Sequence, residues 1–342
     1  MSSLQGFYVS FSGEAQKNPI TNVYALSPSG KTVSAQVLDT SQSYQELRGL
    51  VFGPDGNLYV SQAYKGASKI LQFSGALAPG SSTRALLGAF ATPEASAGLL
   101  HPYQPAFGVD GNLYVTSQDT NVVTAFYGPR SAQKGQAMAN SRFLQSAYPK
   151  GPFNAGTFIP AFSADAGVPP FATVPQAQGG LTFTPTKSST HSVRGLAFDG
   201  AGNLYVADEG NDRVAVFDAG GTFLGAITSS KNHSVKEPVA LSVDPTVTTL
   251  YIGSPGNQRL FTYAFSQLAH GDFQANSLVD DSTRLNKLSA IVVDRDGYIY
   301  TASRDTNRIY QWTASGSFQS DVAGPFTDSP EQMIAVYTAI TG

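Results

Sequence analysis

The chain has 342 residues, of which 41% are hydrophobic and 13% charged, and its formal net charge is −3. This length suits one large closed β domain, and the 21 Lys and Arg residues are scattered, so the basic cluster that nucleic-acid binding needs is not found. The lack of cysteine excludes disulfides and thiolate-bound metals.

One short sequence is repeated five times along the chain. Each copy has an apolar run, a polar turn and a restart close to Leu-Tyr-Val. The copies cover residues 48–60, 104–115, 194–206, 239–252 and 289–300. Four of the turns contain glycine where a tight hairpin needs positive φ, namely Gly56, Gly111, Gly202 and Gly297. Each copy therefore predicts a β-hairpin.

A third apolar segment follows each hairpin, and a weaker fourth segment follows it, as at residues 221–227. The third segments cover residues 68–73, 121–126, 211–217, 257–263 and 307–312. Four antiparallel strands per repeat predict the blade of a β-propeller. Equivalent aromatic residues in the third segments are expected to be buried: Phe73, Phe126, Phe217 and Trp312.

The turn positions, residues 57, 112, 203, 249 and 298, are 55, 91, 46 and 49 residues apart, whereas propeller repeats span roughly 40–50 residues. Insertions explain the long spacing better than a lost blade does. Segment 156–162 resembles the fourth strand at 221–227, and the segments at about 130–154 and 164–192 are expected to be long loops.

The two ends of the chain supply the sixth blade. Residues 7–11, 22–26 and 31–37 resemble second, third and fourth strands, and residues 333–337 resemble a first strand. Pairing them would close the ring and remove the open sheet edges. The sequence therefore predicts one all-β domain over residues 1–342, a six-bladed β-propeller of four-stranded antiparallel blades closed by its N- and C-terminal strands.

The copy from Arg194 to Asp218 resembles an NHL repeat. It reads Gly-Leu-Ala-Phe-Asp-x-x-Gly-Asn-Leu-Tyr-Val-Ala-Asp-x-x-Asn-x-Arg-Val-x-Val-Phe-Asp after the first arginine, and weaker copies cover nearly the whole chain apart from the loops. This resemblance implies an NHL-type propeller. It does not imply one activity, because related propellers include lyases, lactonases, RNA binders and scaffolds.

Ligands of propellers usually bind at the mouth of the central channel. Residues just before each inner strand are expected to line this mouth, and these are Arg48, Tyr103, Arg194, Val239, Ser289 and Gln332. Residues at the end of each second strand lie on the same face, and these are Gln62, Ser117, Asp208, Ser254 and Ser303.

Arg48 and Arg194 carry the strongest functional signal in these two sets. Two cations in a partly dry funnel repel each other and lose hydration, so a compensating anion is expected. One explanation is structural pairing of Arg194 with Asp208. The other is a bound carboxylate, phosphate or sulfate, which a planar guanidinium can bind through two nitrogens.

The leading hypothesis is a ligand-binding propeller that recognises a small anionic molecule, or an acidic group of a larger partner, in its central funnel. Tyr103 would supply a stacking face, Gln332 an amide, and Ser289 and Ser303 hydroxyls. The predicted ligand-binding set is Arg48, Gln62, Tyr103, Arg194, Asp208, Ser289, Ser303 and Gln332. No catalytic residue and no metal ligand is assigned.

The alternative is a lyase or hydrolase that uses a divalent cation (Ca, Zn or Mg) in the same funnel. The NHL resemblance implies comparison with peptidyl-amide-forming lyases, whose zinc-binding histidines precede the inner strands. This chain has Arg48, Arg194 and Ser289 there, which argues against that zinc site. His101, His191 and His233 precede inner strands at a greater distance and could approach the mouth.

A lactonase-like calcium site needs several converging oxygen ligands. Only Asp208 projects from the second-strand set. Asp199, Asp244 and Asp294 recur at the hairpin turns and are interpreted as structural. The third hypothesis is a scaffold that binds proteins through its blade edges or the 164–192 loop.

Compartment and assembly leave fewer traces in the sequence. Residues 1–5 have neither the basic nor the apolar segment of a signal peptide, and no apolar run is long enough to span a membrane. Low charge with abundant Ser, Thr and Gly favours an exported (secreted or periplasmic) protein over a cytoplasmic one. The protein is expected to be a monomer without a membrane contact.

Overall fold

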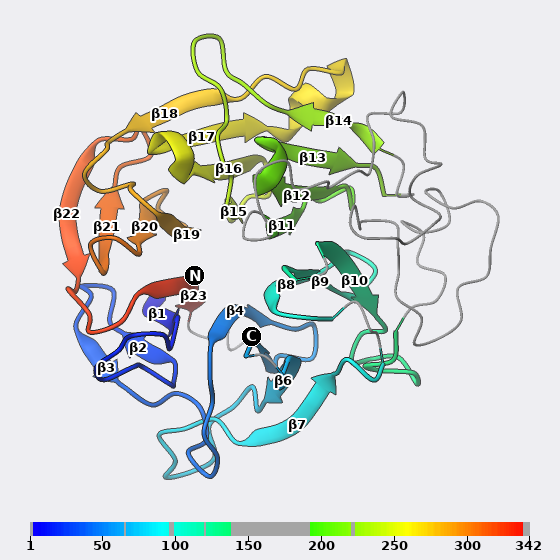
Figure 1. The fold of residues 1–342 in the computed structure, drawn as a ribbon, viewed down its shortest axis with the longest axis vertical. Coiled ribbons are helices and arrows are strands. Elements are labelled where there is room, and N and C mark those ends of the chain that lie inside the picture. Colours follow the sequence, from blue (N-terminus) through cyan, green and yellow to red (C-terminus); the bar gives the residue numbers. More distant parts are fainter. Residues whose placement is uncertain are drawn as a thin grey trace.

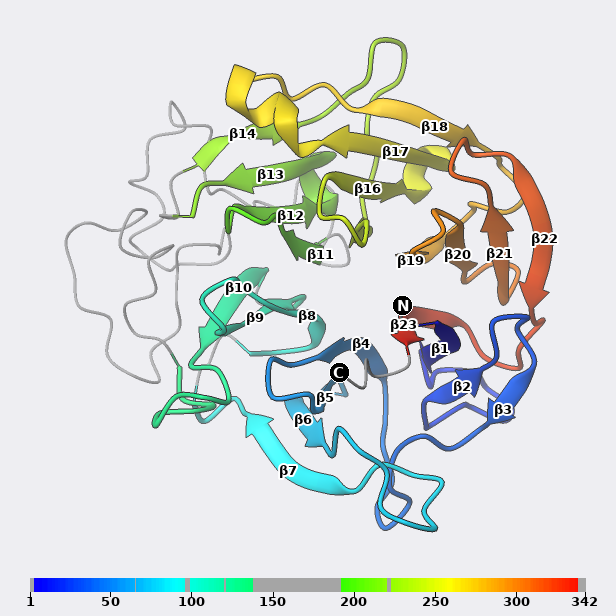
Figure 2. The same cartoon turned by 180° about the vertical axis from the view of Figure 1, so that it is seen from behind.

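The computed structural model describes residues 3–64, 66–95, 99–119, 121–137, 192–219 and 223–337. In these ranges six antiparallel sheets stand as blades around a central axis (Figure 1), and the ring is equally evident from behind (Figure 2). Five sheets have four strands, and the remaining sheet has three described strands. The protein is a six-bladed β-propeller, which confirms the fold predicted from the repeats.

Each blade runs from an inner strand at the channel to an outer strand at the rim. Blade 1 contains β4 (Leu47–Phe52), β5 (Leu58–Gln62), β6 (Lys69–Phe73) and β7 (Leu86–Ala91). Blade 2 contains β8 (Pro102–Phe107), β9 (Leu113–Ser117) and β10 (Val122–Phe126). Blade 3 contains β11 (Val193–Phe198), β12 (Leu204–Asp208), β13 (Arg213–Phe217) and β14 (Phe223–Ile227).

The second half of the chain repeats this order. Blade 4 contains β15 (Ala240–Val243), β16 (Thr249–Ser254), β17 (Arg259–Ala264) and β18 (Asn276–Asp280). Blade 5 contains β19 (Leu288–Val293), β20 (Ile299–Ser303), β21 (Arg308–Trp312) and β22 (Phe318–Ala323). Short 3-10 helices follow some strands: η4 (Glu209–Asn211), η5 (Pro255–Asn257) and η6 (Phe265–His270).

Blade 6 is built from both ends of the chain. Its strands are β23 (Pro330–Tyr337), β1 (Leu4–Phe11), β2 (Tyr24–Leu26) and β3 (Thr32–Ser34), in that order from the channel outward. β1 pairs antiparallel with β23 from Leu4 opposite Tyr337 to Phe11 opposite Pro330. The predicted closure of the ring by the terminal strands is therefore confirmed, and this pairing leaves β1 without a free inner edge.

The repeated turn holds each hairpin through one aspartate. In blade 3 Asp199 Oδ1 accepts the backbone N–H groups of Ala201 and Asn203, and Oδ2 accepts the hydroxyl of Tyr205 at 3.3 Å. Gly202 has φ of 84° at the position that the sequence assigned to glycine. The structural interpretation of these aspartates is thus confirmed, because their oxygens serve the turn itself.

The core lies between neighbouring blades. Tyr205 of blade 3 is fully buried and faces Tyr263 of blade 4, with ring centroids 6.2 Å apart. Trp312 is 1% exposed, and its indole N–H donates to Thr301 Oγ1 at 2.8 Å. Phe73, Phe126 and Phe217 are fully buried as well, so the predicted packing role of these equivalent aromatic residues is confirmed.

Some predictions concern residues outside the described ranges. The insertions at about 130–154 and 164–192, and the fourth strand expected at 156–162, lie mostly or wholly outside the described residues. The described helices are all too short or too polar to cross a membrane.

Candidate functional site: the mouth of the central channel

The mouth is organised by a register shift at the start of the inner strands. In blade 1, Leu47 pairs with Gln62 and Leu50 with Val60, so one extra residue is inserted on the inner strand. Comparable shifts occur in β8, β11, β19 and at the β23–β1 pair. Such bulges redirect side chains and are frequent beside functional sites. The residues at the shifted positions are Arg48, Tyr103, Arg194, Ser289 and Glu331.

This register corrects the sequence alignment in blade 6. Gln332 pairs with Ser10, and Glu331 occupies the shifted position between the paired residues. Gln332 uses its amide oxygen to accept the N–H of Met333 at 3.0 Å. The bulge moves the alignment by one residue, so the mouth receives a carboxylate from Glu331 instead of the predicted amide.

Arg48 lies at the centre of an ion network at the mouth. It is only 4% exposed, and its guanidinium donates to Glu14 Oε1 at 2.7 Å and to the carbonyl of Ser12 at 3.2 Å. Glu331 and Glu46 carboxylate oxygens lie 3.2 and 3.9 Å from its terminal nitrogens. Burial opposes its charge, but attraction by Glu331 and Glu14 outweighs burial and raises the pKa of Arg48.

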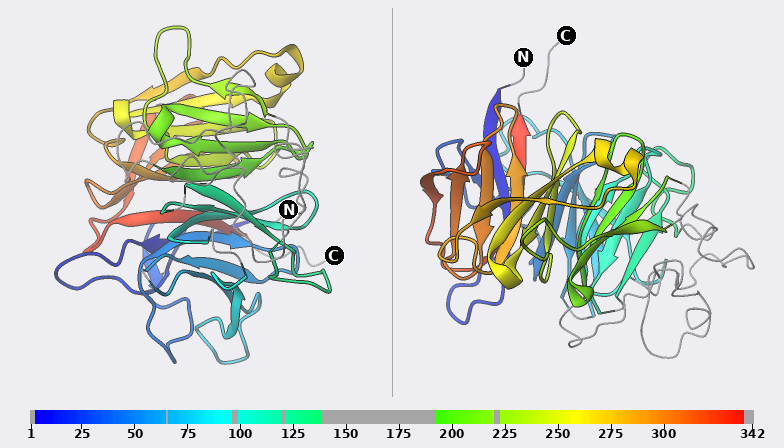
Figure 3. Two further views of the ribbon diagram at one scale, coloured as in Figure 1. Left: turned by 45° about the vertical axis from the view of Figure 1, so that its right-hand side comes forward. Right: turned by 90° about the horizontal axis from the view of Figure 1, so that it is seen from above.

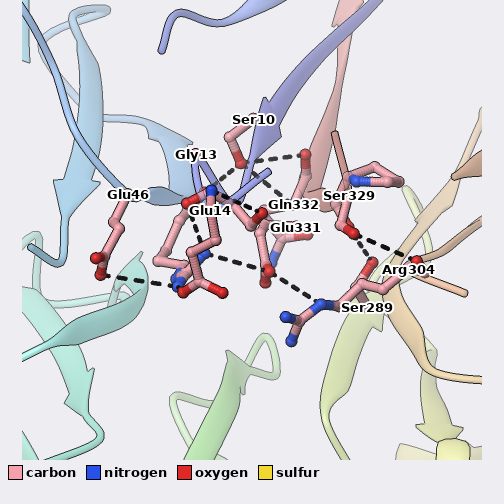
Figure 4. Close-up of polar contacts among 12 residues, drawn as sticks. Ser10, Gly13, Glu14, Glu46, Ser289, Arg304, Ser329, Glu331 and Gln332 are labelled. Carbon is pink, nitrogen blue, oxygen red and sulfur yellow. Dashed lines mark hydrogen bonds and ion pairs between the residues drawn. The ribbon is translucent and has the colours of Figure 1, made fainter. Parts of the chain in front are cut away.

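Glu331 links Arg48 to a third arginine, Arg304. The Glu331 side chain is 1% exposed, and its Oε1 lies 3.2 Å from Arg48 Nη1 and 3.1 Å from Arg304 Nε. Neither carboxylate oxygen meets a described donor at a good hydrogen-bond angle. We therefore treat the contacts as mainly Coulombic. Figure 4 shows Glu331, from β23 of blade 6, joined to the Arg304 side chain.

Tyr103 and Arg194 continue the network on the other side of the channel. The guanidinium carbon of Arg194 lies 5.3 Å from the centre of the Tyr103 ring, and Arg194 Nε donates to Glu209 Oε2 at 2.7 Å. Tyr103 is buried, and burial together with the charge of Glu331 raises the pKa of its hydroxyl, so this phenol stays neutral.

One explanation from the sequence paired Arg194 with Asp208, but in the structure Asp208 has other partners. Asp208 accepts Arg213 Nε at 2.7 Å and both of its oxygens accept from Asn211 Nδ2 at 2.9 Å. The carboxylate beside Arg194 is Glu209, which follows Asp208 directly. Burial raises the pKa of Asp208 to about 6, against the opposing effect of Arg213.

The predicted hydroxyl and amide ligands serve the fold in this structure. Ser289 donates to the carbonyl of Pro330 at 2.6 Å, and Ser303 donates to the carbonyl of Asn286 at 2.6 Å. Gln62 donates to the carbonyl of Ala67 at 3.1 Å. These three side chains hydrogen-bond to backbone carbonyls around the mouth. Of the predicted set, the structure brings only Arg48, Tyr103 and Arg194 into one network.

A cavity of about 360 Å³ opens beside this network. It lies over blades 3 to 5 and is lined by polar and charged side chains that include Arg194, Glu209, Glu237, Lys287 and Arg304, with Tyr103 at its blade 2 side. The Arg304 side chain is 37% exposed. In Figure 4 its Nε is joined to Glu331, and among the described residues no hydrogen bond or ion pair is formed by its two terminal nitrogens.

The channel below the mouth contains a second cavity of about 300 Å³, lined by all six inner strands. Most of its lining residues are apolar, with Gln104, Ser242 and Gln332 as polar exceptions, and none is charged. The charged groups are thus concentrated at the mouth, which makes the 360 Å³ cavity the candidate site.

His101 also reaches the mouth, as the sequence suggested. Its side chain is 18% exposed, with Nε2 3.9 Å from Glu46 Oε2 and Nδ1 3.5 Å from Asp119 Oδ1. Burial and the positive charge of Arg48 lower the pKa of His101, so its neutral form is favoured. His191 lies outside the described residues. Among the described residues no group of three His, Asp or Glu side chains is arranged to hold a metal ion.

Several contributors were missed in the sequence, among them Glu14, Glu209, Arg304 and Glu331. Arg304 directly follows Ser303, and Glu331 directly precedes Gln332, so each is one residue from a predicted position. Glu14 lies in the loop after β1, where no repeat signal exists.

Comparison with known proteins agrees with the fold and leaves the activity open. Neither a protein-family model nor a curated protein matches the chain. Solved structures do match, and they are six-bladed β-propellers.

Three of these structures show the range. A chain of the nidogen/laminin complex is 12% identical with a TM-score of 0.57, and the match covers 96% of this chain and 97% of that one. Virginiamycin B lyase from Staphylococcus aureus is 13% identical with a TM-score of 0.50, covering 84% and 73%. A protein assigned as a 6-phosphogluconolactonase from Bacteroides uniformis is 13% identical with a TM-score of 0.53, covering 92% and 81%. Identities this low establish a shared fold only.

Proposed function

We propose that the mouth of this propeller, which we take to be of the NHL type, binds a small anionic molecule, and that Arg304 is its main contact. The observation that supports this most is the pairing of Arg304. Glu331 holds Arg304 through Nε, and Arg304 lines the cavity with two terminal nitrogens that meet no described hydrogen-bond or ion-pair partner. A guanidinium edge presented in this way suits a carboxylate or phosphate, which can accept from two nitrogens at once.

The proposal gives different roles to the two arginines found in the sequence. Arg48 is buried and surrounded by Glu14, Glu46 and Glu331, so it positions Glu331 and does not contact the ligand. Arg194 lines the cavity, but Glu209 already matches its charge. Lys287 also lines the cavity, but its Nζ lies 3.6 Å from Asp305 Oδ1. Arg304, which meets Glu331 through Nε alone, is therefore the main positive group that an anion would meet.

Isothermal titration calorimetry with inorganic phosphate and with citrate tests this proposal. Arg304→Gln should weaken binding about 10-fold or more, because a charge-assisted hydrogen bond contributes about 1.5–3 kcal/mol. Arg308→Gln is the matched control, because Arg308 has a similar side-chain exposure of 33%, pairs with Asp321 and does not line the cavity. Absence of binding by the wild type, or equal losses in both variants, would contradict the proposal.

A lyase or hydrolase working in the same funnel is the second candidate, and His101 favours it. A neutral imidazole flanked by carboxylates can accept a proton as a general base, and Arg48 and Arg194 lie close enough to affect its charge. Two of the structural neighbours are a lyase and a protein assigned as a lactonase.

Mass spectrometry after incubation with quinupristin, with which a related lyase was crystallised, and with 6-phosphogluconolactone tests this candidate. His101→Gln should abolish any conversion, and His270→Gln, on the outer helix η6, should retain it. Metal analysis of the same sample decides whether a divalent cation takes part. Failure to convert either compound would count against the candidate, and the absence of any small-molecule effect on stability would favour a protein-binding scaffold.

We also propose that the protein acts as a monomer, without a nucleic-acid or membrane partner. Light scattering after size-exclusion chromatography checks the oligomeric state.

A further inference from the structure

A further cavity lies between blade 6 and blade 1, on the face opposite the mouth. Its volume is about 450 Å³, against about 360 Å³ for the cavity at the mouth. Gly6 and Val336 line it, and they pair with each other near the outer ends of β1 and β23. The mouth lies at the other end of these two strands, where Phe11 pairs with Pro330. The cavity is therefore separate from the anion site proposed above.

Apolar side chains make up most of the lining of this cavity. Phe7, Leu26 and Val37 line it and are buried. Val33 and Leu77 line it as well, but they are 70% and 48% exposed. Large apolar side chains left in water around a hollow of this size favour a ligand that covers them.

A buried cation contacts Tyr8, which is part of the cavity wall. Arg84 is 6% exposed, and among the described residues no carboxylate pairs with it. Its terminal nitrogens donate to the carbonyls of Ser74 and Gly75 and, at 3.0 Å, to Tyr8 Oη, whereas its Nε has no described partner. Its guanidinium carbon lies 5.3 Å from the ring centres of Tyr8 and Phe52. Neutral groups alone thus meet this buried charge.

Tyr8 carries the effect of this charge to the cavity. Its Oη accepts a hydrogen bond from Arg84, so its own O–H remains available as a donor, and no acceptor in the described part of the chain takes it. Linked hydrogen bonds polarise one another, so a phenol that accepts from a cation becomes a stronger donor. A carboxylate gains most here, because it accepts from the hydroxyl and is attracted by the arginine behind it.

We propose that this cavity binds an aliphatic monocarboxylate, with its carboxylate at the Tyr8 hydroxyl and its chain over Val33 and Leu77. The inference does not depend on the proposed function of the mouth. A neutral apolar molecule would leave the charge of Arg84 without an anion, and a small polar anion would leave the apolar side chains in water. Only an amphipathic anion satisfies both, and about 450 Å³ is within the range of small-molecule sites.

Calorimetric titration with octanoate, octanol and octylamine tests the inference. Octanoate should bind the wild type about 10-fold more tightly than octanol, as expected for one charge-assisted hydrogen bond. Octylamine, which is a cation at neutral pH, should bind more weakly than octanol because Arg84 repels it. Hexanoate should bind more weakly than octanoate by up to about 4-fold for each buried methylene that is lost.

Two pairs of variants test the head and the chain of the ligand. Tyr8→Phe keeps the ring and should remove the preference for octanoate over octanol, whereas Tyr298→Phe, at a 40% exposed tyrosine outside the cavity, should retain it. Val33→Glu places a like charge at the cavity and should weaken octanoate binding. Leu87→Glu, at a 54% exposed position outside the cavity, should not. If Tyr8→Phe folds poorly, the second pair still tests the inference, because both positions are exposed.

Citrate separates this site from the mouth. Competition between excess citrate and octanoate, or wild-type binding of octanoate by Tyr8→Phe, would place octanoate elsewhere and overturn the inference alone. Octanoate binding that depends on Tyr8 would support the inference even if neither phosphate nor citrate bound the mouth. Equal affinity for octanoate and octanol would overturn the role of the buried charge. Octanoate binding only after removal of residues 338–342 would assign the cavity to the end of the chain itself and would also overturn the inference.

Discussion

Replacing Glu331 by Gln is expected to lower the free energy of unfolding by about 3 kcal/mol, because it removes a carboxylate that neutralises a buried arginine. Glu331 is 1% exposed and lies 3.2 Å from Arg48, whose side chain is 5% exposed. Breaking a buried pair on one side costs about 3–5 kcal/mol. The lower end applies here, since Arg48 keeps Glu14 at 2.7 Å.

Glu14→Gln is the matched comparison, since it removes a carboxylate from the same guanidinium. The Glu14 side chain is 51% exposed, so solvent screens its attraction and the expected loss is about 1 kcal/mol or less. Combining Glu331→Gln with Arg48→Met should cost less than the sum of the two single changes, because no buried cation remains without a partner.

Urea unfolding followed by tryptophan fluorescence measures these differences. Trp312 is the only tryptophan and is 1% exposed, so its emission should shift on unfolding. A Glu331→Gln variant within about 0.5 kcal/mol of the wild type, or a Glu14→Gln variant that loses as much, would refute the argument that burial controls the strength of these pairs.

Three further predictions concern the scaffold. Burial raises the pKa of Asp208 from 3.8 to about 6, so the folded state binds a proton more tightly than the unfolded chain. The stability of the wild type should therefore fall relative to Asp208→Asn as pH rises from about 4 to 6. Urea unfolding midpoints measured across that pH range would show this. Val247 has φ of 55° in the blade 4 turn, where the other four hairpin turns have glycine. Val247→Gly should therefore raise the free energy of unfolding by about 0.5–1 kcal/mol, and with it the melting temperature. An unchanged or lower melting temperature would contradict this. Ending the chain before Pro330 removes β23 and exposes the inner edge of β1, so calorimetry should show no cooperative transition; a wild-type transition would disprove closure by the terminal strands.

The ring could be predicted because its signals recur. Each of the five hairpin turns contains an aspartate and four of them contain glycine at the position of positive φ, and the strands at the two ends of the chain complete one another. Blade 4 shows how a weak copy still follows the pattern. Val247 adopts the positive φ of the missing glycine, since the hydrogen bond from its N–H to the carbonyl of Asp244 closes the turn.

The mouth was predicted only in part, because its side chains depend on features without a repeating sequence. The shift in β23 places Glu331 at the mouth in place of Gln332, and a bulge of this kind is not evident from apolar alternation. Glu14 meets Arg48 from a loop 34 residues away. Pairing between such distant polar residues is a tertiary property, and one sequence does not reveal which carboxylate meets which arginine.

The direction of the terminal strands determines how this domain can be attached to anything else. Phe11 of β1 and Pro330 of β23 pair at the mouth, so Leu4 and Tyr337 lie side by side at the opposite face, where β1 begins and β23 ends in Figure 3. A surface, a tag or a further domain joined at either end would therefore sit behind the ring. The charged mouth would face away from the attachment, open to whatever diffuses toward it.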